Sequence, residues 1–323
     1  MASKINLIFA NGEKMPAVGL GTWRAPDAEV EAALNAALEA GYRHIDCAPV
    51  YGNEKVIGKV FKEWISSEKL KRSDLFICTK LPPFGNRASD VEKCLKKSLA
   101  DLELEYLDLF LIHVPFAVPY TEGPLLKDDN GDLLLSDTDH VETWKELERF
   151  QSAGLIKHIG ISNFNERQIQ RLLDNCVVKP EVLQVEMHVY LQQKELVAFC
   201  KANNILITAY SPLGSKGYDK VLAASGVVRE LPNLLENSVI VEVANRIGKS
   251  PAQVLLRYLL ELGVSVIPKS TNAGRLRSNI DLFDFSLSAS DKDAIAALDA
   301  NVRVVDFKFF AGIHKHPEFP FNA

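Results

Sequence analysis

The sequence predicts an α/β fold in which parallel strands close into a (β/α)8 barrel, and three observations lead to this prediction. Short apolar segments rich in Val, Ile and Leu alternate with segments of helical periodicity, as expected for buried parallel strands joined by helices. The chain contains eight such apolar segments. Each segment runs into a polar or ionisable residue, and in a closed parallel barrel all strand ends meet at one rim. These side chains are therefore expected to form one site.

The predicted elements follow one another in a regular order. The chain opens with a hairpin whose strands, Ile5–Phe9 and Met15–Val18, turn at Asn11-Gly12. The eight barrel strands are expected near Val18, His44, Leu75, Leu107, His158, Val182, Leu206 and Val264. Helices are expected over Ala28–Ala40, Ser89–Asp101, Val141–Ala153, Glu166–Asn175, Lys194–Asn203 and Ala252–Glu261. Eight units that close on themselves are the economical arrangement, and a doubly wound open sheet is the alternative.

Two of the predicted helices carry recognisable start signals. Ser89 and Glu92, three residues apart, predict a capping box, in which each side chain bonds the other residue's backbone N–H. Pro251 stands at the head of another helix, where its missing N–H costs nothing.

Length and charge restrict the class of protein. A chain of 323 residues accommodates one barrel of roughly 250 residues with insertions, so residues 1–323 are expected to form a single domain. The net charge of −5 offers no overall basic field for nucleic acid or an anionic membrane. No apolar run of about 18 residues predicts a membrane span. Met1-Ala2-Ser3-Lys4 is not followed by the apolar core of a signal peptide.

The cysteines predict free thiols. Their number, five, is odd, their spacings are wide and no CxxC pair occurs, which argues against a disulfide framework and a zinc knuckle. Free thiols persist in a reducing compartment, so a cytoplasmic location is expected. The cysteines are Cys47, Cys78, Cys94, Cys176 and Cys200.

Three segments are candidates for substrate contact. The connections Val114–Thr138 and Pro212–Asn237 are long, and loops of that length are usually lids or binding loops. The tail beyond Ala300 carries five phenylalanines, which can pack on the barrel, wall a substrate pocket, or do both: Phe307, Phe309, Phe310, Phe319 and Phe321. The tail histidines His314 and His316 have no partner cluster, so no metal site is expected.

Four rim residues, Asp46, Tyr51, Lys80 and His113, are the predicted catalytic group. Each alone is better explained as a satisfied structural residue, but together they form a proton-donating device. A Lys80 ammonium beside Tyr51 would favour the phenolate and lower the tyrosine pKa, while Asp46 would keep Lys80 charged. His113 could orient a carbonyl oxygen. Tyr51 would then be the general acid for a carbonyl that becomes an alcohol, a step that also needs a hydride.

The residues suggest a nucleotide site without a Rossmann fingerprint, since no GxGxxG follows a strand. Lys269, Ser270, Arg275 and Asn279 surround a helix start and could bind a phosphate monoester. Ser162, Asn163 and Gln184 could hydrogen-bond a carboxamide, and Tyr210 could stack on a flat ring.

Six segments resemble the signature segments of the aldo-keto reductase superfamily, in order and spacing, from Gly19 to Asn279. They are Gly19-Leu20-Gly21-Thr22-Trp23, Gly41-Tyr42-Arg43-His44-Ile45-Asp46, Leu111-Ile112-His113, Gly160-Ile161-Ser162-Asn163-Phe164-Asn165, Ala209-Tyr210-Ser211-Pro212-Leu213-Gly214 and Ile267-Pro268-Lys269-Ser270. The resemblance, to aldose and aldehyde reductases in particular, implies a (β/α)8 TIM barrel, NADPH as cofactor and a small-molecule carbonyl substrate. Separately, a monomer is expected.

The resemblance also assigns residues to roles. The catalytic tetrad would be Asp46, Tyr51, Lys80 and His113. The nicotinamide would be held by Ser162, Asn163, Gln184 and Tyr210, the pyrophosphate by Ser211, Leu213 and Ser215, and the adenosine phosphate by Lys269, Ser270, Arg275 and Asn279. Gly21, Thr22, Trp23 and Asp46 would also contact the cofactor. The substrate would contact Trp23, Val50, Tyr51, His113 and Val114.

Three positions depart from the family pattern. Val114 and Pro82 stand where many members carry a Trp, so two aromatic walls of the substrate pocket are missing. Ser278 replaces an acidic residue near the adenine. We expect a wider, more aliphatic pocket that favours hydrophobic carbonyls. The segment His316-Pro317-Glu318-Phe319-Pro320-Phe321 resembles invertebrate members, some of which reduce ecdysteroid ketones, so steroid ketones belong among the candidate substrates.

Two alternatives fit the same fold. A Schiff-base aldolase would use Lys80 or Lys269 as nucleophile, which requires a lysine desolvated away from carboxylates. A non-catalytic NADPH-binding protein would keep the fold without turnover, against which the intact tetrad argues.

Overall fold

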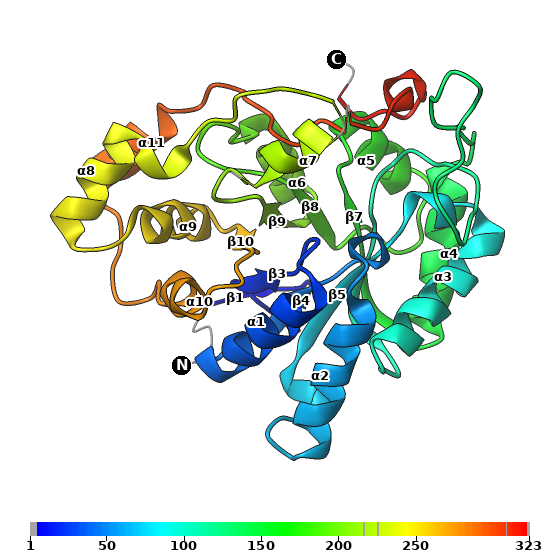
Figure 1. The fold of residues 1–323 in the computed structure, drawn as a ribbon, viewed down its shortest axis with the longest axis horizontal. Coiled ribbons are helices and arrows are strands. Elements are labelled where there is room, and N and C mark those ends of the chain that lie inside the picture. The colour runs from blue at the N-terminus through cyan, green and yellow to red at the C-terminus, as the bar shows by residue number, and fades with distance from the viewer. Residues whose placement is uncertain (1–4, 216, 225, 308, 322–323) are drawn as a thin grey trace.

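The computed structural model describes residues 5–215, 217–224, 226–307 and 309–321, and it confirms the predicted (β/α)8 barrel. Figure 1 shows the strands at the centre of the molecule with helices around them. The barrel strands pair in parallel and in chain order. They are β3 (Gly19–Gly21), β4 (His44–Asp46), β5 (Phe76–Leu81), β6 (Leu107–Ile112), β7 (Ile156–Ser162), β8 (Val182–Glu186), β9 (Leu206–Tyr210) and β10 (Ser265–Val266).

Two bridges join the first and last strands of this sheet. Val18 pairs with Val266 and Gly21 pairs with Lys269, both in parallel. At Gly21 a Cβ would lie 2.7 Å from the carbonyl oxygen of Ile267, so only glycine allows the two segments to approach this closely. The barrel is therefore nearly closed, and the open-sheet alternative is wrong.

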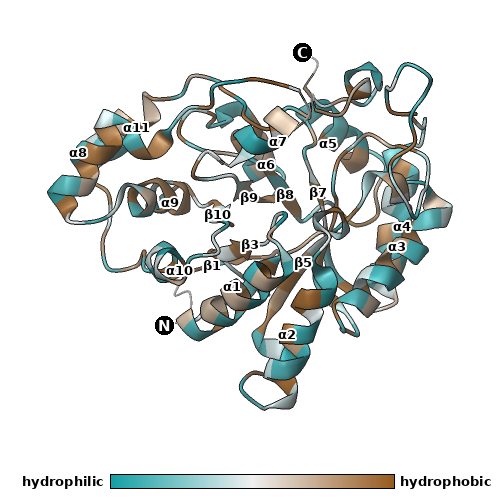
Figure 2. Cartoon of the chain, in the orientation of Figure 1, coloured by the Kyte–Doolittle hydropathy of each residue, from teal (hydrophilic) through white to brown (hydrophobic). Residues whose placement is uncertain are grey.

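The six predicted helices form in the expected places, with ends that differ by one or two residues. The helices are α1 (Asp27–Ala40), α2 (Glu54–Ser66), α3 (Ala88–Asp101), α4 (His140–Ser152), α5 (Glu166–Leu173), α6 (Lys194–Ala202), α7 (Tyr218–Ala224), α8 (Ser238–Ile247), α9 (Pro251–Glu261), α10 (Ala273–Ile280) and α11 (Ala289–Ala296). The strands consist mostly of hydrophobic residues, whereas the helices contain both hydrophobic and hydrophilic residues, as Figure 2 shows. This pattern is expected when helices bury one face on a sheet.

The predicted capping box of Ser89 and Glu92 is wrong. Helix α3 begins one residue earlier, at Ala88, with Arg87 at the cap position and no capping side chain. Ser89 is therefore inside the first turn, where its backbone already has helical geometry. By contrast, Pro251 does occupy the first turn of α9, behind a capping box of Ser250 and Gln253.

The predicted hairpin closes the amino-terminal end of the barrel. Its strands, β1 (Asn6–Ile8) and β2 (Lys14–Pro16), are antiparallel and shorter than predicted. Between them Phe9 stacks on His158 of β7, with ring centroids 3.6 Å apart and planes 7° from parallel. This end of the barrel is therefore filled by side chains, which leaves the carboxyl ends of the strands for a site.

The two long connections and the tail lie at the carboxyl-terminal rim. Residues 114–138 form neither helix nor strand, whereas 212–237 contain α7 and a short 3-10 turn, Leu234–Glu236. The tail packs against 114–138, where Leu133 donates from its backbone to Ala311 and Lys315 pairs with Asp132. Figure 1 shows the red tail beside this connection.

The cysteines are free, as predicted, with four buried and Cys176 half-buried. None of the described helices is long and apolar enough to cross a bilayer. Within the described ranges, no group of three or more His, Cys, Asp or Glu residues could hold a metal ion.

Candidate active site

The carboxyl-terminal rim carries a buried ion pair between neighbouring strands. Asp46 is the last residue of β4 and Lys80 lies one residue before the end of β5, and both side chains are almost fully buried. Lys80 Nζ donates to Asp46 Oδ1 at 2.6 Å and to the Cys47 carbonyl at 2.9 Å. Burial alone would lower the pKa of Lys80, but the Asp46 carboxylate outweighs it and holds that pKa above the ordinary lysine value. Lys80 is therefore an ammonium.

Tyr51 reaches this ammonium from a short turn after β4. Pro49 starts the 3-10 turn Pro49–Tyr51, and Gly52 ends it with a φ of 76°. The Lys80 Nζ then lies 3.3 Å from the Tyr51 hydroxyl. Burial raises the pKa of Tyr51 to about 12, because desolvation of the phenolate exceeds the opposing effect of Lys80. The prediction of a lowered tyrosine pKa is thus wrong, because the sequence reasoning left out desolvation.

His113 follows β6 and faces the same point. Its ring stands edge-on to the Tyr51 ring, with centroids 5.9 Å apart and an interplanar angle of 83°. Burial, and then the nearby Lys80 charge, lower the pKa of His113 well below its ordinary value. A neutral imidazole can donate one N–H to a carbonyl oxygen. The four predicted catalytic residues therefore come together.

A connected set of polar side chains surrounds this group on the next strands. Gln184 of β8 donates to Asp46 Oδ2 at 2.8 Å, and Ser162 of β7 donates to the Gln184 carbonyl at 2.8 Å. Asn163 donates to the His113 carbonyl at 2.9 Å and accepts from the Tyr210 hydroxyl at 2.7 Å. The four residues predicted to hold a nicotinamide thus lie beside the tetrad and fix one another's orientation.

Ser211 and Ser215 have left-handed backbones, with φ of 52° and 47°. Their hydroxyls are hydrogen-bonded at 2.5 Å, and Gly214 between them has a φ of 81°. Leu213 is half-buried and packs on the core. Non-glycine residues in this conformation are strained and cluster at ligand sites, which fits the predicted pyrophosphate contact.

The predicted phosphate end is a cationic helix start. Asn272 caps α10, and Ser270 Oγ accepts from Arg275 Nε at 3.3 Å. Lys269 is exposed, and in the part of the chain that the structure describes neither Lys269 nor Arg275 has a carboxylate partner. Asn279 is buried on the same helix. Two cations without counter-ions at a helix start fit a phosphate monoester.

The remaining predicted contacts border this rim. Thr22 Oγ1 donates to the Asp46 carbonyl at 2.8 Å. Trp23 is half-buried, with its ring 6.0 Å from that of Tyr218 on α7. Val50 is 44% exposed, whereas Val114 is buried against the tail. The pocket-wall candidates therefore divide into an open position, Val50, and a position covered by the tail, Val114.

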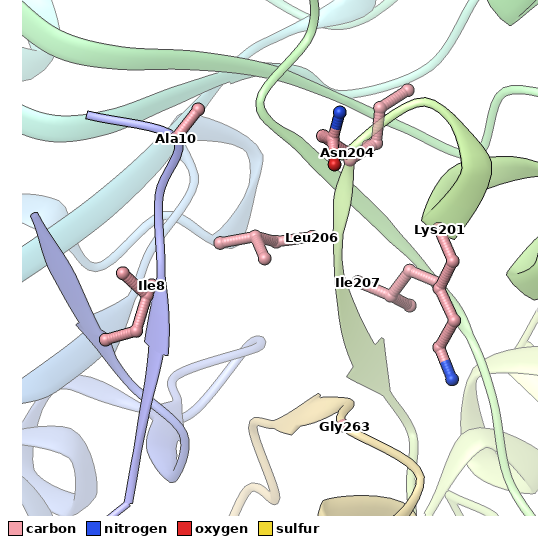
Figure 3. Close-up of a pocket in the computed structure, with 8 residues that line it drawn as sticks. Ile8, Ala10, Lys201, Asn204, Leu206, Ile207 and Gly263 are labelled. Carbon is pink, nitrogen blue, oxygen red and sulfur yellow. The ribbon is translucent and has the colours of Figure 1, made fainter. Parts of the chain in front are cut away.

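A surface hollow of about 260 Å³ lies elsewhere, between the hairpin and the amino-terminal ends of β9 and β10 (Figure 3). Its lining is mostly aliphatic, and its one ionisable side chain, Lys201, donates to the Leu262 carbonyl at 3.0 Å. This hollow therefore offers a single ionisable side chain, whereas the opposite rim brings several together, and we place the chemistry at that rim.

Comparison with known proteins agrees with this geometry. The model of the aldo/keto reductase family matches residues 17–300. The chain belongs to the aldo/keto reductase family. It is 44% identical over 323 residues to aldo-keto reductase family 1 member A1 of Bos taurus and 43% identical over 323 residues to that of Homo sapiens, covering 98% of both chains each time. The aldose reductase structure from Schistosoma japonicum superposes with a TM-score of 0.89 at 40% identity, again covering 98% of both chains.

As an aldo/keto reductase, the protein is an enzyme, and members of this family generally use NADP(H) to reduce carbonyl groups. The Schiff-base alternative at Lys80 fails on the geometry, since that chemistry needs a neutral amine and the Asp46 contact favours the ammonium. The non-catalytic alternative does not fit membership of this enzyme family.

Two buried acids of this reductase were missed by the sequence reasoning. Glu54 begins α2 and accepts from Thr79 at 2.5 Å and from Ser98 at 3.0 Å. Glu186 ends β8 and contacts the tail. The strand alternation offered a signal for the second, because it places Glu186 on the same face as Gln184.

Proposed function

We propose that the protein reduces aldehydes and ketones to alcohols with NADPH, using Tyr51 as general acid. The observation that carries the proposal is the 3.3 Å contact between Lys80 Nζ and the Tyr51 hydroxyl, with Asp46 holding Lys80 charged. An ammonium at that distance stabilises the phenolate left after proton transfer. The bound cofactor would supply the hydride.

In this proposal the rim residues orient the substrate and move one proton. His113 donates a hydrogen bond to the substrate carbonyl oxygen and holds it beside the Tyr51 hydroxyl. As negative charge develops on that oxygen, Tyr51 transfers its proton to it. The resulting tyrosinate is stabilised by Lys80, and Asp46 prevents Lys80 from losing its own proton.

The same proposal assigns the cofactor contacts. Ser162, Asn163, Gln184 and Tyr210 would hold the nicotinamide, Ser211, Leu213 and Ser215 the pyrophosphate, and Lys269, Ser270, Arg275 and Asn279 the adenosine phosphate. Gly21, Thr22 and Trp23 would complete the cofactor site. Lys269 and Arg275, which have no carboxylate partner in the part of the chain that the structure describes, support a preference for the phosphate-bearing NADPH.

For the substrate we propose hydrophobic carbonyl compounds, with steroid ketones such as ecdysteroids as one candidate class. The support is an apolar cluster at the rim in which Val114 packs with Phe116, Phe307 and Phe319. Burying apolar substrate surface there would contribute roughly 25 cal/mol per Å². We further propose that residues 1–323 act as one domain, as a cytoplasmic monomer.

A carbonyl panel tests the activity. Purified protein is mixed with NADPH and with aromatic aldehydes, enals, steroid ketones, glucose and a short aliphatic aldehyde, and loss of NADPH absorbance is followed. Turnover with hydrophobic carbonyls is expected. Absence of turnover across the panel, together with borohydride trapping of a substrate on lysine, would overturn the proposal in favour of an aldolase. Light scattering of the same preparation checks the monomer.

A further inference from the structure

Glu186 is a fully buried carboxylate whose partners come mainly from the start of the tail. Its Oε1 accepts from the backbone N–H of Val304 at 2.7 Å, and its Oε2 accepts from that of Val305 at 2.8 Å. His188 Nε2 lies 2.9 Å from Oε1. Both acid and histidine have side chains with 0% exposure.

Burial of the Glu186 carboxylate costs free energy unless the tail is docked against it. No Lys or Arg among the described residues pairs with Glu186, so the two amides and His188 are the groups that replace its water shell. A buried carboxylate that loses such donors retains the penalty of desolvation. Glu186 therefore favours the docked tail over a detached one, because only the docked tail supplies both amides.

The position of Glu186 links the tail to the catalytic rim. Side chains two residues apart on a strand point to the same face, so Glu186 shares a face with Gln184, which donates to Asp46. The register partner of Glu186 in the neighbouring strand β9 is Tyr210, and the hydroxyl of Tyr210 donates to Asn163. One strand thus presents both the residue that orients the tetrad and the residue that holds the tail.

The tail amides lead directly into the apolar cluster. Val305, held by Glu186, packs with that cluster, and so do Phe309 and Phe310 further along. In Figure 1 the segment after α11 runs along the top of the molecule to the red turn beside the connection that precedes α4. A displacement at Val304 and Val305 would therefore move the aromatic residues that follow.

We propose that Glu186 is a positioning residue for substrate specificity, which fixes the start of the tail at Val304 and Val305 so that the aromatic side chains of the tail can enclose bulky hydrophobic carbonyls. This inference rests on the proposed reductase function. Small aldehydes, which do not reach the tail, are independent of Glu186. Glu186 itself touches neither Tyr51 nor Lys80 in the structure and takes no part in proton transfer.

The test variant is Glu186→Gln, which keeps the size of the side chain. It replaces one accepting oxygen with an NH2 group, so that two donors face each other at one of the tail N–H groups. The Michaelis constant for an aromatic or steroid carbonyl is expected to rise about tenfold or more, the scale for loss of a charge-assisted hydrogen bond. The Michaelis constant for a short aldehyde, kcat and the NADPH dissociation constant are expected to stay within about two-fold of wild type. Equal increases for both substrates would overturn the inference.

Hydrogen exchange gives a readout besides activity. Peptides that contain Val304 and Val305 are expected to exchange slowly in the wild type and faster in Glu186→Gln, while barrel peptides are unchanged. Unchanged exchange in the tail would overturn the inference even if activity fell. A wild type that turns over no carbonyl, yet shows the exchange difference, would instead contradict the proposed function and leave the tail contact standing.

The matched control is Glu181→Gln at the other end of the β8 segment. Glu181 bonds His158 at 2.9 Å at the amino-terminal end of the barrel and has no contact with the tail. Its loss is expected to lower stability without changing the ratio of Michaelis constants for bulky and short substrates. If Glu186→Gln fails to fold, Glu186→Asp takes its place. Asp keeps the charge but is one methylene too short to reach both amides, so the same increase in the Michaelis constant for bulky carbonyls is expected, and equal increases for both substrates would again overturn the inference.

Discussion

At the scale of single residues, the rim depends on the balance between burial and charge. Burial alone would lower the pKa of Lys80 and raise the pKa of Tyr51, which disfavours the charged form of each. Asp46 reverses the first effect, because a carboxylate at 2.6 Å favours the ammonium, but Lys80 does not reverse the second. Tyr51 is therefore protonated at neutral pH, which is the form a general acid requires.

The first prediction concerns Tyr51. Tyr51→Phe is expected to lower kcat by about 10²–10⁴-fold, the usual scale for a missing general acid, and to change NADPH affinity by no more than a few-fold. Stopped-flow turnover and fluorescence titration of NADPH measure the two quantities. Tyr258→Phe is the control, since that buried hydroxyl bonds Gln192 away from the rim. Retention of most activity in Tyr51→Phe would remove Tyr51 from the mechanism.

The second prediction concerns cofactor choice. Neutralising both Lys269 and Arg275 to Gln is expected to abolish a preference for NADPH over NADH, because each charged contact to a phosphate contributes roughly 1.5–3 kcal/mol. The ratio of kcat/KM for the two cofactors measures it. The control double variant, Lys145→Gln with Arg149→Gln, makes the same charge change on α4. If the test variant still discriminates like the wild type, the phosphate site lies elsewhere.

At the scale of elements, the start of α2 connects the turn of Tyr51 to the strand of Lys80. Asn53 donates to the carbonyls of Thr22 and Ala25, and the next residue, Glu54, accepts from Thr79 of β5. Further along, a Cβ on Gly58 would lie 2.3 Å from the Asp101 carbonyl, so glycine alone lets α2 pack this closely against the end of α3. These contacts hold the turn rigidly beside β5.

The third prediction follows from the burial of Glu54. Burial raises the pKa of Glu54 to about 7 from an ordinary value of 4.5, although Thr79 and Ser98 oppose the change. Between these two pH values the folded state binds more protons than the unfolded state, so the free energy of unfolding falls as pH rises. Glu54→Gln removes this dependence. From pH 5 to pH 8 its stability relative to wild type is expected to improve by about 2–3 kcal/mol.

Urea unfolding of both proteins at the two pH values measures this difference. Glu63→Gln on the exposed face of the same helix is the control and is expected to show a much smaller change with pH. A stability difference between Glu54→Gln and wild type that is the same at pH 5 and pH 8 would show that Glu54 is already ionised at low pH.

At the scale of the whole molecule, the tail joins segments that are distant in the sequence. Glu318 pairs with Arg167 and accepts from Gln168 at the start of α5. His316 Nε2 bonds the Ser136 carbonyl at 2.7 Å in the connection before α4. With Glu186 holding its beginning, the tail is fixed at both ends across the rim, a position from which it can enclose a substrate.

The fourth prediction concerns this tail. Truncation after Val302 is expected to raise the Michaelis constant for bulky hydrophobic carbonyls much more than for short aldehydes, because apolar contact worth roughly 25 cal/mol per Å² is lost only for the former. Steady-state kinetics with both substrates measure it. Phe309→Ala is a milder variant that keeps the tail, and it is also expected to raise the Michaelis constant more for bulky carbonyls than for short aldehydes. Equal effects on both substrates, or a wild type that prefers glucose, would contradict the prediction.

Much of the fold and the tetrad could be predicted because they follow from local pattern plus one geometric rule. Apolar segments fixed the approximate positions of β4, β5 and β6, and the shared rim of a parallel barrel then brought Asp46, Lys80 and His113 together before any distance was known. The capping box at Ser89 failed because the same spacing of Ser and Glu also occurs inside a helix, and only the backbone shows where the helix begins.

By itself the sequence determined the alternation of strands and helices, the polar residues at the strand ends and the absence of disulfide spacing, because these depend on which residues neighbour one another along the chain. Only the tertiary structure decided the pKa direction at Tyr51, the burial of Glu54 and the contact of Glu186 with the tail. Those properties depend on how completely water is excluded and on groups as much as 119 residues away in the chain. A carboxylate is by default a surface residue, and only the packed structure shows which one is buried and which donors replace its water.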